Sequence, residues 1–224
     1  MRFTSLKTVF VLAVIALAAG CATPTPYDYS AFERNNPASI VVLPPVNTSP
    51  DIKASYSVLS QVTYPLAEAG YYVFPVAVVD ETFKQNGLMN ADEMHQAPPA
   101  KLREIFGADS ALYIEVSRYG SSYKVLSSEV VVEAAGKLVD LRSGDVLWEG
   151  RALASTAENQ NNNSGGLIGM LITAAVNQIV NTLSDRSHEV AGITSNRLLS
   201  SSVPNGILSG PRSPQYQQSR LANR

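Results

Sequence analysis

The sequence is poor in the residues on which thiol, metal and histidine chemistry depend. Its 224 residues include one cysteine, Cys21, and two histidines, His95 and His188. A single cysteine leaves no partner for a disulfide, and this set of residues is too small for a typical zinc site. We therefore expect neither a metal site nor cysteine-based catalysis.

Charge is also scarce. Charged residues make up 16% of the chain, below the roughly one quarter that is typical of soluble proteins. The 17 basic and 19 acidic residues give a formal charge of -2. Proteins that bind a phosphate backbone need clustered lysine and arginine, so we expect no nucleic-acid partner.

Catalytic patterns are missing as well. Asp80 with Glu81 and Asp92 with Glu93 are sequence neighbours, and adjacent side chains on a helix or strand do not face each other. Residues 165–169 lack the Lys-Ser/Thr ending of a phosphate loop, and no Gly-x-Ser-x-Gly motif presents a nucleophile to either histidine. We expect a non-enzymatic protein without a cofactor, in which both histidines are ordinary surface residues.

The first 20 residues, by contrast, contain a long apolar run. Arg2 and Lys7 precede apolar residues 9–19, which end in small side chains. This order is typical of a secretory signal peptide. A membrane-spanning helix needs about 20 apolar residues, so the run is too short for that alternative. We predict a signal peptide over residues 1–20.

The single cysteine follows this signal at once. Leu17-Ala18-Ala19-Gly20-Cys21 resembles the lipobox of bacterial lipoproteins, whose cysteine carries a diacylglyceryl thioether and an N-acyl chain, although Leu17 is one position before the usual leucine. The alternative is an incidental cysteine in a plain secretory signal. Ala22, which is not Asp, indicates transfer to the outer membrane. We predict lipidation of Cys21 and a lipid anchor in the outer membrane, with the protein facing the periplasm.

The mature chain then contains 15 basic and 19 acidic residues, a net charge of -4, so its predicted membrane attachment depends on the lipid. Residues 21–37 contain three prolines and predict a flexible tether. Residues 39–46 predict a buried strand, residues 51–69 a helix kinked at Pro65 and ended at Gly70, and residues 71–79 a second strand. This is a β-α-β unit.

Antiparallel elements follow the β-α-β unit. We expect a short helix over 80–87, a surface crossing over 88–99 and a helix over 100–106 that stops at Gly107. The predicted strands are residues 111–119, 123–141 and 146–154, the last two joined by a tight turn at Arg142-Ser143-Gly144-Asp145. A long helix over 167–199 and a disordered tail over 200–224 complete the chain. The predicted fold is α/β, a single domain over 38–199 with a mixed sheet and a long C-terminal helix.

Several segments together resemble a family of Gram-negative lipoproteins that includes a neisserial surface-antigen candidate. They include Ile40-Val41-Val42-Leu43-Pro44-Pro45-Val46-Asn47, Leu66-Ala67-Glu68-Ala69-Gly70-Tyr71-Tyr72-Val73 and Leu141-Arg142-Ser143-Gly144-Asp145-Val146-Leu147-Trp148. The resemblance covers roughly residues 1–155. It implies an α/β domain similar to the TolB amino-terminal domain and to the periplasmic part of CsgG-type secretion channels. It supplies no catalytic residues.

A charge-free stretch around residues 167–180 is the most distinctive part of the second half. Its apolar residues cover all faces of the predicted helix, so one sheet could not bury them, and it is too short to span a bilayer. Three alternatives are open, namely a helix deep in the core, a self-association or partner surface, and an in-plane membrane contact. The candidate surface residues are Gly165, Gly169, Met170, Ile172, Ala174 and Ala175.

A second candidate surface follows the first strand. Pro44, Pro45 and Asn47 lie at its carboxyl end, where α/β sheets expose crevices. A partner could dock there, or the prolines could only stiffen the loop. Overall we expect a non-enzymatic outer-membrane lipoprotein that self-associates and binds envelope proteins as an assembly or scaffold subunit, with a CsgG-like secretion channel as one setting. The alternative is a small-ligand or cell-wall binding module, or an auxiliary subunit of an envelope transport system.

Overall fold

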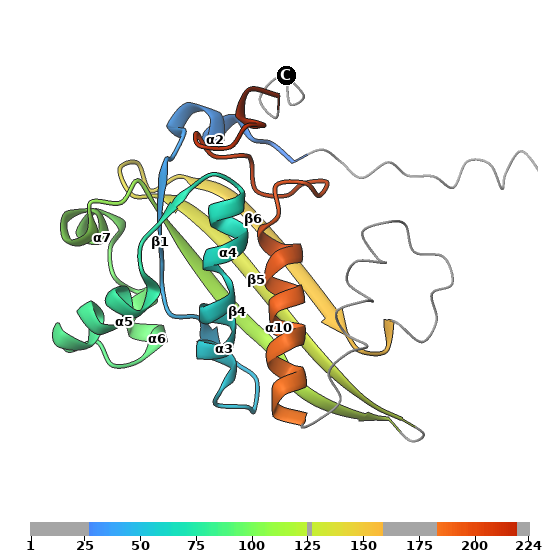
Figure 1. The fold of residues 1–224 in the computed structure, drawn as a ribbon. Helices are drawn as coiled ribbons and strands as arrows, with labels where there is room; N and C mark the ends of the chain where they lie inside the picture. Colours follow the sequence, from blue (N-terminus) through green and yellow to red (C-terminus); the bar gives the residue numbers. More distant parts are fainter. Residues whose placement is uncertain (1–26, 125–126, 159–182, 219–224) are drawn as a thin grey trace, which may run out of the picture.

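One mixed six-stranded sheet organises the chain in the computed structural model, which describes residues 27–124, 127–158 and 183–218 (Figure 1). The strand order is β3-β1-β4-β5-β6, with β2 beside β4. β1 pairs in parallel with β3 and β4, whereas β4, β5 and β6 pair antiparallel. The predicted α/β class with a mixed sheet is therefore confirmed. The strands are β1 (Ser39–Val42), β2 (Val46–Asn47), β3 (Tyr72–Val73), β4 (Ser110–Lys124), β5 (Ser127–Asp140) and β6 (Val146–Ser155).

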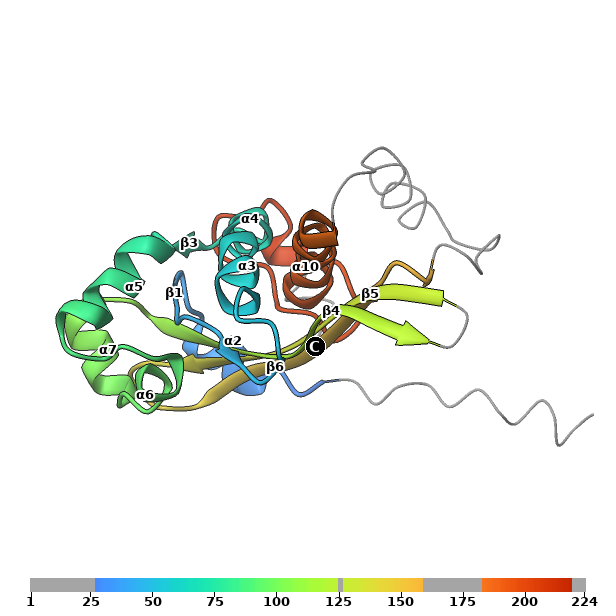
Figure 2. The same cartoon turned by 90° about the horizontal axis from the view of Figure 1, so that it is seen from below.

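Helices cover the two faces of the sheet unequally (Figure 2). The described helices are α2 (Ser30–Asn35), α3 (Ala54–Gln61), α4 (Thr63–Glu68), α5 (Val76–Gln85), α6 (Ala91–His95), α7 (Pro99–Phe106) and α10 (Leu183–Leu199). α3, α4 and α10 lie side by side on one face, whereas α5, α6 and α7 cover only the β1 side of the other. The second face over β4, β5 and β6 stays largely uncovered.

β1 shows why its sequence is continuously apolar. Ile40 and Val42 belong to the core under α3, α4 and α10, whereas Val41 and Leu43 belong to a second core under α5, α6 and α7. Alternate residues of a strand point to opposite faces, and both faces are covered here. The predicted buried first strand is confirmed over Ser39–Val42.

The predicted strand over 71–79 is mostly wrong. β3 has two residues, and α5 begins at Val76, directly after Pro75. Val79 and Phe83 then lie four residues apart on one helix face and are buried against β1. The β-branched run resembles a strand, but the proline and this spacing favour a helix.

The helix predicted over 51–69 is two helices. α3 ends at Gln61 and α4 begins at Thr63, so the interruption comes before the expected kink at Pro65. A proline ring clashes with the carbonyl four residues earlier, which here is that of Gln61. Pro65 is tolerated because it lies in the first turn of α4, where its missing N–H has no partner to lose.

Local signals predicted several other elements well. α7 starts at Pro99 and stops at Gly107, which has a left-handed φ of 68°. The turn after β5 is formed by Asp140 Oδ1, which accepts from the backbone N–H groups of Arg142 and Ser143 at 2.9 and 2.8 Å. The predicted surface crossing contains α6, whose Met94 is buried. The predicted long helix is present as α10 over 183–199, and residues 167–182 lie outside the described part.

The two ends of the described chain differ from the sequence prediction. Phe32 in α2 is 1% exposed, and Ile207 is also 1% exposed, although residues 21–37 predict a tether and residues 200–224 a disordered tail. We call residues 200–216 the C-terminal strap. Composition missed both segments because single apolar side chains in polar surroundings anchor them. Cys21 and residues 219–224 lie outside the described part.

The strap holds the N-terminal segment in place. Tyr27 N donates to Asn205 Oδ1 at 3.0 Å, and the Tyr29 hydroxyl donates to the Gly206 carbonyl. Trp148 Nε1 donates to the Asn205 carbonyl at 3.0 Å, and the Tyr216 hydroxyl donates to Asn36 Oδ1 at 2.8 Å. The first and last described segments are therefore parts of one folded body.

Candidate functional site

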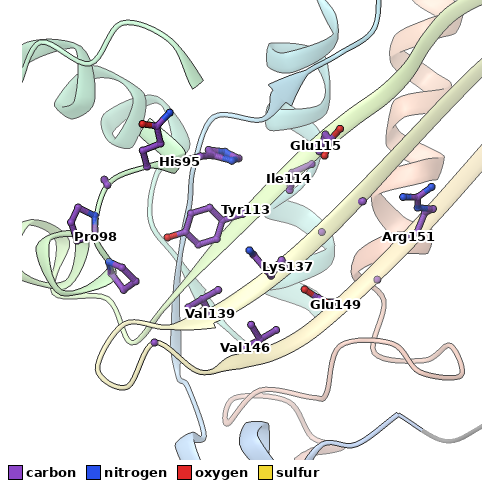
Figure 3. A pocket seen from close by; sticks show the side chains of 17 residues that line it. His95, Pro98, Tyr113, Ile114, Glu115, Lys137, Val139, Val146, Glu149 and Arg151 are labelled. Carbon is purple, nitrogen blue, oxygen red and sulfur yellow. The ribbon is translucent and has the colours of Figure 1, made fainter. Parts of the chain in front are cut away.

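An open groove of about 870 Å³ lies on the uncovered sheet face (Figure 3). β4, β5 and β6 form its floor, and residues 95–99, between α6 and α7, form one wall. The strand register places Tyr113 opposite Lys137 and Lys137 opposite Glu149. The next row along the strands contains Glu115, Ala135 and Arg151.

The floor of the groove is hydrophilic because strand residues alternate. Leu112, Ile114 and Leu138 point into the core under α10, so their neighbours in sequence point into the groove. The side chains of Glu115, Lys137, Glu149 and Arg151 are exposed, and their two positive and two negative charges balance. Ala135, between Glu115 and Arg151 in its row, leaves space at the centre.

His95 orders the wall of the groove. Its Nε2 lies 3.0 Å from the Pro44 carbonyl, so this nitrogen carries the proton and donates. The ring lies edge-on to Tyr113 at 5.2 Å, and Lys137 Nζ lies 5.7 Å from the centre of the Tyr113 ring. Burial is the main cause that lowers the pKa of His95. His95 is therefore not the ordinary surface histidine that the sequence predicts.

The predicted docking loop supports this wall. Pro44 and Pro45 are buried, and the Pro45 carbonyl accepts from Ser55 Oγ at 2.6 Å. Asn47 Nδ2 donates to the Asp51 carbonyl at 2.8 Å. These contacts fit the alternative of a stiffened loop, because they leave few groups of these three residues for a partner.

The lining of the groove contains few groups of the kinds that catalysis commonly uses. None of its 17 lining residues is a serine, threonine or cysteine, and its carboxylates, Glu115 and Glu149, are exposed in an open groove. Acid-base catalysis depends on carboxyl groups tuned by burial or by close charges. In the described ranges, no group of three or more His, Cys, Asp or Glu residues could hold a metal ion.

The outer edge of β6, beside the groove, is already occupied by contacts from other parts of the chain. Glu149 N donates to the Tyr27 hydroxyl at 3.1 Å, and Ser155 N donates to Glu158 Oε1 at 2.9 Å. Arg197 Nη1 donates to the Leu153 carbonyl at 2.8 Å. Such contacts oppose the addition of a further strand at this edge.

The structure also brings His188 close to a serine. His188 Nδ1 lies 2.8 Å from Ser57 Oγ, and Gln61 Nε2 lies 2.7 Å from His188 Nε2. With the Gln61 amide donating to Nε2, Nδ1 carries the proton and donates to Ser57. The Tyr119 hydroxyl donates to the same serine oxygen at 2.8 Å. His188 is not arranged as a base for Ser57, and this cluster links α10 to α3.

A second cavity, of about 560 Å³, lies between α4, α10 and the strap. Its lining residues include Glu68, Arg197 and a run of three serines, Ser200, Ser201 and Ser202. Arg197 Nη2 already pairs with Glu158 Oε2 at 2.8 Å. The cavity therefore offers fewer uncommitted charged groups than the groove.

The other sequence-predicted site residues lie outside the described ranges. These are Cys21 and the candidate association surface of Gly165, Gly169, Met170, Ile172, Ala174 and Ala175. None of the helices in the described part is long and apolar enough to span a bilayer. The groove itself is absent from the sequence prediction, and the only local signal for it is the alternation of charged and apolar residues in β4, β5 and β6.

The part of the chain that matches a known family is nearly the same as the part that the structure describes. A family model described as "Putative lipoprotein GNA1162-like" matches residues 27–212, which begin at the first described residue and include most of the strap. A relative in Neisseria meningitidis serogroup B, named "Putative lipoprotein NMB1124/NMB1162", is 50% identical over 206 residues, which cover 92% of this chain and 95% of the relative.

Solved structures show related folds. The crystal structure of lipoprotein GNA1162 from Neisseria meningitidis is 53% identical, covers 65% of this chain and 100% of its own, and has a TM-score of 0.53. A PelC dodecamer from Paraburkholderia phytofirmans is 14% identical, covers 79% of this chain and 93% of its own, and has a TM-score of 0.43. The likeness to TolB and CsgG-type domains stays a prediction. From the family match and the identity to the neisserial relative, the chain belongs to the GNA1162-like lipoprotein family.

Proposed function

We propose that this protein is a non-enzymatic lipoprotein of the outer membrane, anchored through lipid on Cys21 and facing the periplasm. Its α/β domain acts there as an assembly or scaffold subunit of an envelope complex. A CsgG-like secretion channel is one complex of this kind. Membership of a lipoprotein family supports the anchor, and the lipobox supports Cys21 as its site.

The uncovered sheet face is the observation that carries the scaffold role. Three long antiparallel strands present a rigid surface with alternating charges, and the wall of residues 95–99 borders it on one side only. Interfaces of transient complexes are no more apolar than the rest of a protein surface, have a polar rim and need not enclose their partner. The groove is therefore better suited to an extended protein segment than to a small substrate that must be shielded from water.

The groove also favours a second candidate function, a small-ligand or cell-wall binding module. Tyr113 lies between His95 and Lys137, and the charged side chains of Glu115 and Glu149 point into the same hollow (Figure 3). Polar groups that converge beside an aromatic ring are typical of ligand sites. Such a site would be expected to keep its ligand through gentle purification.

One experiment in cells tests both candidates. A photoreactive residue replaces Ala135 or Lys137 in the groove, and matched controls replace Tyr56 or Tyr64 on the exposed surface of α3 and α4. We expect the groove positions to crosslink a specific envelope protein and the controls not to do so. No protein crosslink at the groove, together with a ligand retained by the purified protein, would contradict the scaffold role and favour the binding module.

The anchor is tested separately. The Cys21→Ser variant should leave the membrane pellet after an alkaline wash, because each buried CH2 of the lost acyl chains contributes about 0.8 kcal/mol to membrane binding. The wild-type protein, washed in the same way, is the control. A variant that stays in the pellet would show that something other than lipid on Cys21 holds the protein there.

A further inference from the structure

The place where the lipid tether joins the folded body limits how the protein can stand on a membrane. Tyr27 is fixed to the body through Asn205 and Glu149, so only residues 22–26 separate the body from Cys21. A chain of this length spans at most about 20 Å. The attachment point of the body must therefore remain close to the bilayer.

This attachment point lies at one end of an elongated molecule. We call it the α2 end, and it contains α2, the turn over residues 141–145 and the strap. Asn35 Nδ2 donates to Asp145 Oδ2 at 3.3 Å and joins α2 to the turn. The opposite end, which we call the hairpin end, contains the Lys124 and Ser127 ends of β4 and β5 and the start of α10 (Figure 1). The 15 residues of β4 run between the two ends, a length of about 50 Å.

The charge of the α2 end does not oppose its approach to a bilayer. The charged residues of α2, the turn and the strap are Glu33, Arg34, Arg142, Asp145 and Arg212, and Asp28 lies just before α2, so acidic and basic groups balance there. The rest of the chain therefore carries the whole net charge of -4. An anionic phospholipid surface repels acidic groups that come within a Debye length, about 8 Å at physiological salt. The balanced α2 end can therefore approach such a surface without net repulsion.

We infer that the α2 end faces the bilayer and that the hairpin end points away from it. This inference rests on the proposed anchor at Cys21 and extends it to a membrane-facing surface. The groove lies on the side of the body, so in this orientation its mouth faces sideways, along the plane of the membrane. A partner held in the groove lies beside the body and within about 50 Å of the bilayer.

Energy transfer from the protein to the membrane tests this orientation. The lipidated full chain is placed in vesicles of phosphatidylethanolamine and phosphatidylglycerol that contain an acceptor dye on the headgroups. Because the sulfur of Cys21 is bound in the thioether, an introduced cysteine is the only free thiol for a donor dye. The donor dye is placed at exposed positions. Arg34→Cys and Arg142→Cys carry it at the α2 end, and Lys53→Cys and Ser121→Cys carry it toward the hairpin end as matched controls.

We expect higher transfer efficiency from positions 34 and 142 than from positions 53 and 121, since Ser121 lies 11 residues along β4 from Ser110, or about 35 Å. A flexible ten-residue insertion after Pro26 should lower the efficiency at positions 34 and 142, because it lets the body move away. Equal efficiencies, or higher values at positions 53 and 121, would overturn the orientation.

Mass spectrometry separates the two ways in which the experiment can fail. A purified protein that lacks the mass of the acyl chains overturns the proposed anchor and this inference with it. A protein that carries the chains but shows the reverse order of efficiencies overturns the orientation alone. Transfer from a donor at the groove position Lys137→Cys that clearly exceeds transfer from positions 34 and 142 would indicate a body lying on its groove, which also contradicts the inference.

Discussion

His95 is the residue that most directly connects the groove to the fold. Its Nε2–H group binds the Pro44 carbonyl after β1, and its ring packs edge-on against Tyr113 in β4. One imidazole therefore fixes both the wall and the floor of the groove. Burial disfavours the charged form of this ring and lowers the pKa of His95, although its hydrogen bond to Pro44 acts in the opposite direction.

The lowered pKa of His95 predicts a pH-dependent stability. The unfolded chain has a histidine pKa of about 6.5, so between that value and the lower folded value the unfolded state binds more protons. The contribution of neutral His95 is present above about pH 6.5 and is lost as the pH falls toward the folded pKa. Urea unfolding of the wild type between pH 7.5 and pH 5 should show this loss, and His95→Gln should lack it.

The control for this prediction is the difference between the two proteins, because carboxyl groups titrate in both. An NMR titration of the His95 ring in the folded wild type should give a pKa below the ordinary histidine value. If wild type and His95→Gln lose stability with the same slope, His95 is not buried as described.

The strap is folded, although its composition predicts a disordered tail. Serine, glycine and proline dominate it, yet Ile207 and Leu208 belong to the core with Trp148 and Phe32. The Tyr71 hydroxyl donates to the Leu208 carbonyl, and Gly210 N donates to the Ala69 carbonyl at 2.7 Å. The strap therefore completes the core that α2 begins.

Truncation of one strap residue tests this. Ile207→Ala should lower the free energy of unfolding by about 2 to 4 kcal/mol, because it leaves a cavity at a fully buried position. Val203→Ala, in the same strap but 38% exposed, should change it by less than about 0.5 kcal/mol. Both values come from urea denaturation of the mature chain. Equally small effects would mean that the tail is disordered in solution, as the sequence predicts.

Elements defined by local chemistry could be predicted from the sequence. Pro99 and Gly107 delimit α7, and Asp140 with the residues after it forms the turn before β6. The groove could not be predicted, because it depends on which residues of three strands lie opposite one another. Gly150 in the groove is an example. A Cβ at this position would lie 2.2 Å from Trp148 Cζ2, so a glycine is needed there, but the sequence alone does not show that the two residues are in contact.

Association between copies of the protein would involve the charge-free stretch between β6 and α10. The stretch around residues 167–180 has no charged residue, and the described ends of the chain on either side of it are Glu158 after β6 and Leu183 in α10. We propose that Gly165, Gly169, Met170, Ile172, Ala174 and Ala175 form a surface for a second copy or another envelope protein. Small residues allow close approach between chains.

Charge placed in this stretch should separate the copies. Met170→Glu and Ile172→Glu, each in the Cys21→Ser background, should lower the mass measured by light scattering. Gln178→Glu, which adds the same charge at a polar position nearby, is the matched control and should keep the wild-type mass. An unchanged mass in folded Met170→Glu and Ile172→Glu proteins would argue against a surface for a second copy.

The contact between the two ends of the chain also sets the order of folding. Tyr27 binds Asn205 and Tyr29 binds Gly206, across 178 and 177 residues. A chain that leaves the cell interior with its N-terminus first cannot make these bonds until nearly all of it has crossed. Until then Phe32 has no strap to cover it, so the newly lipidated protein would present an apolar surface beside its anchor.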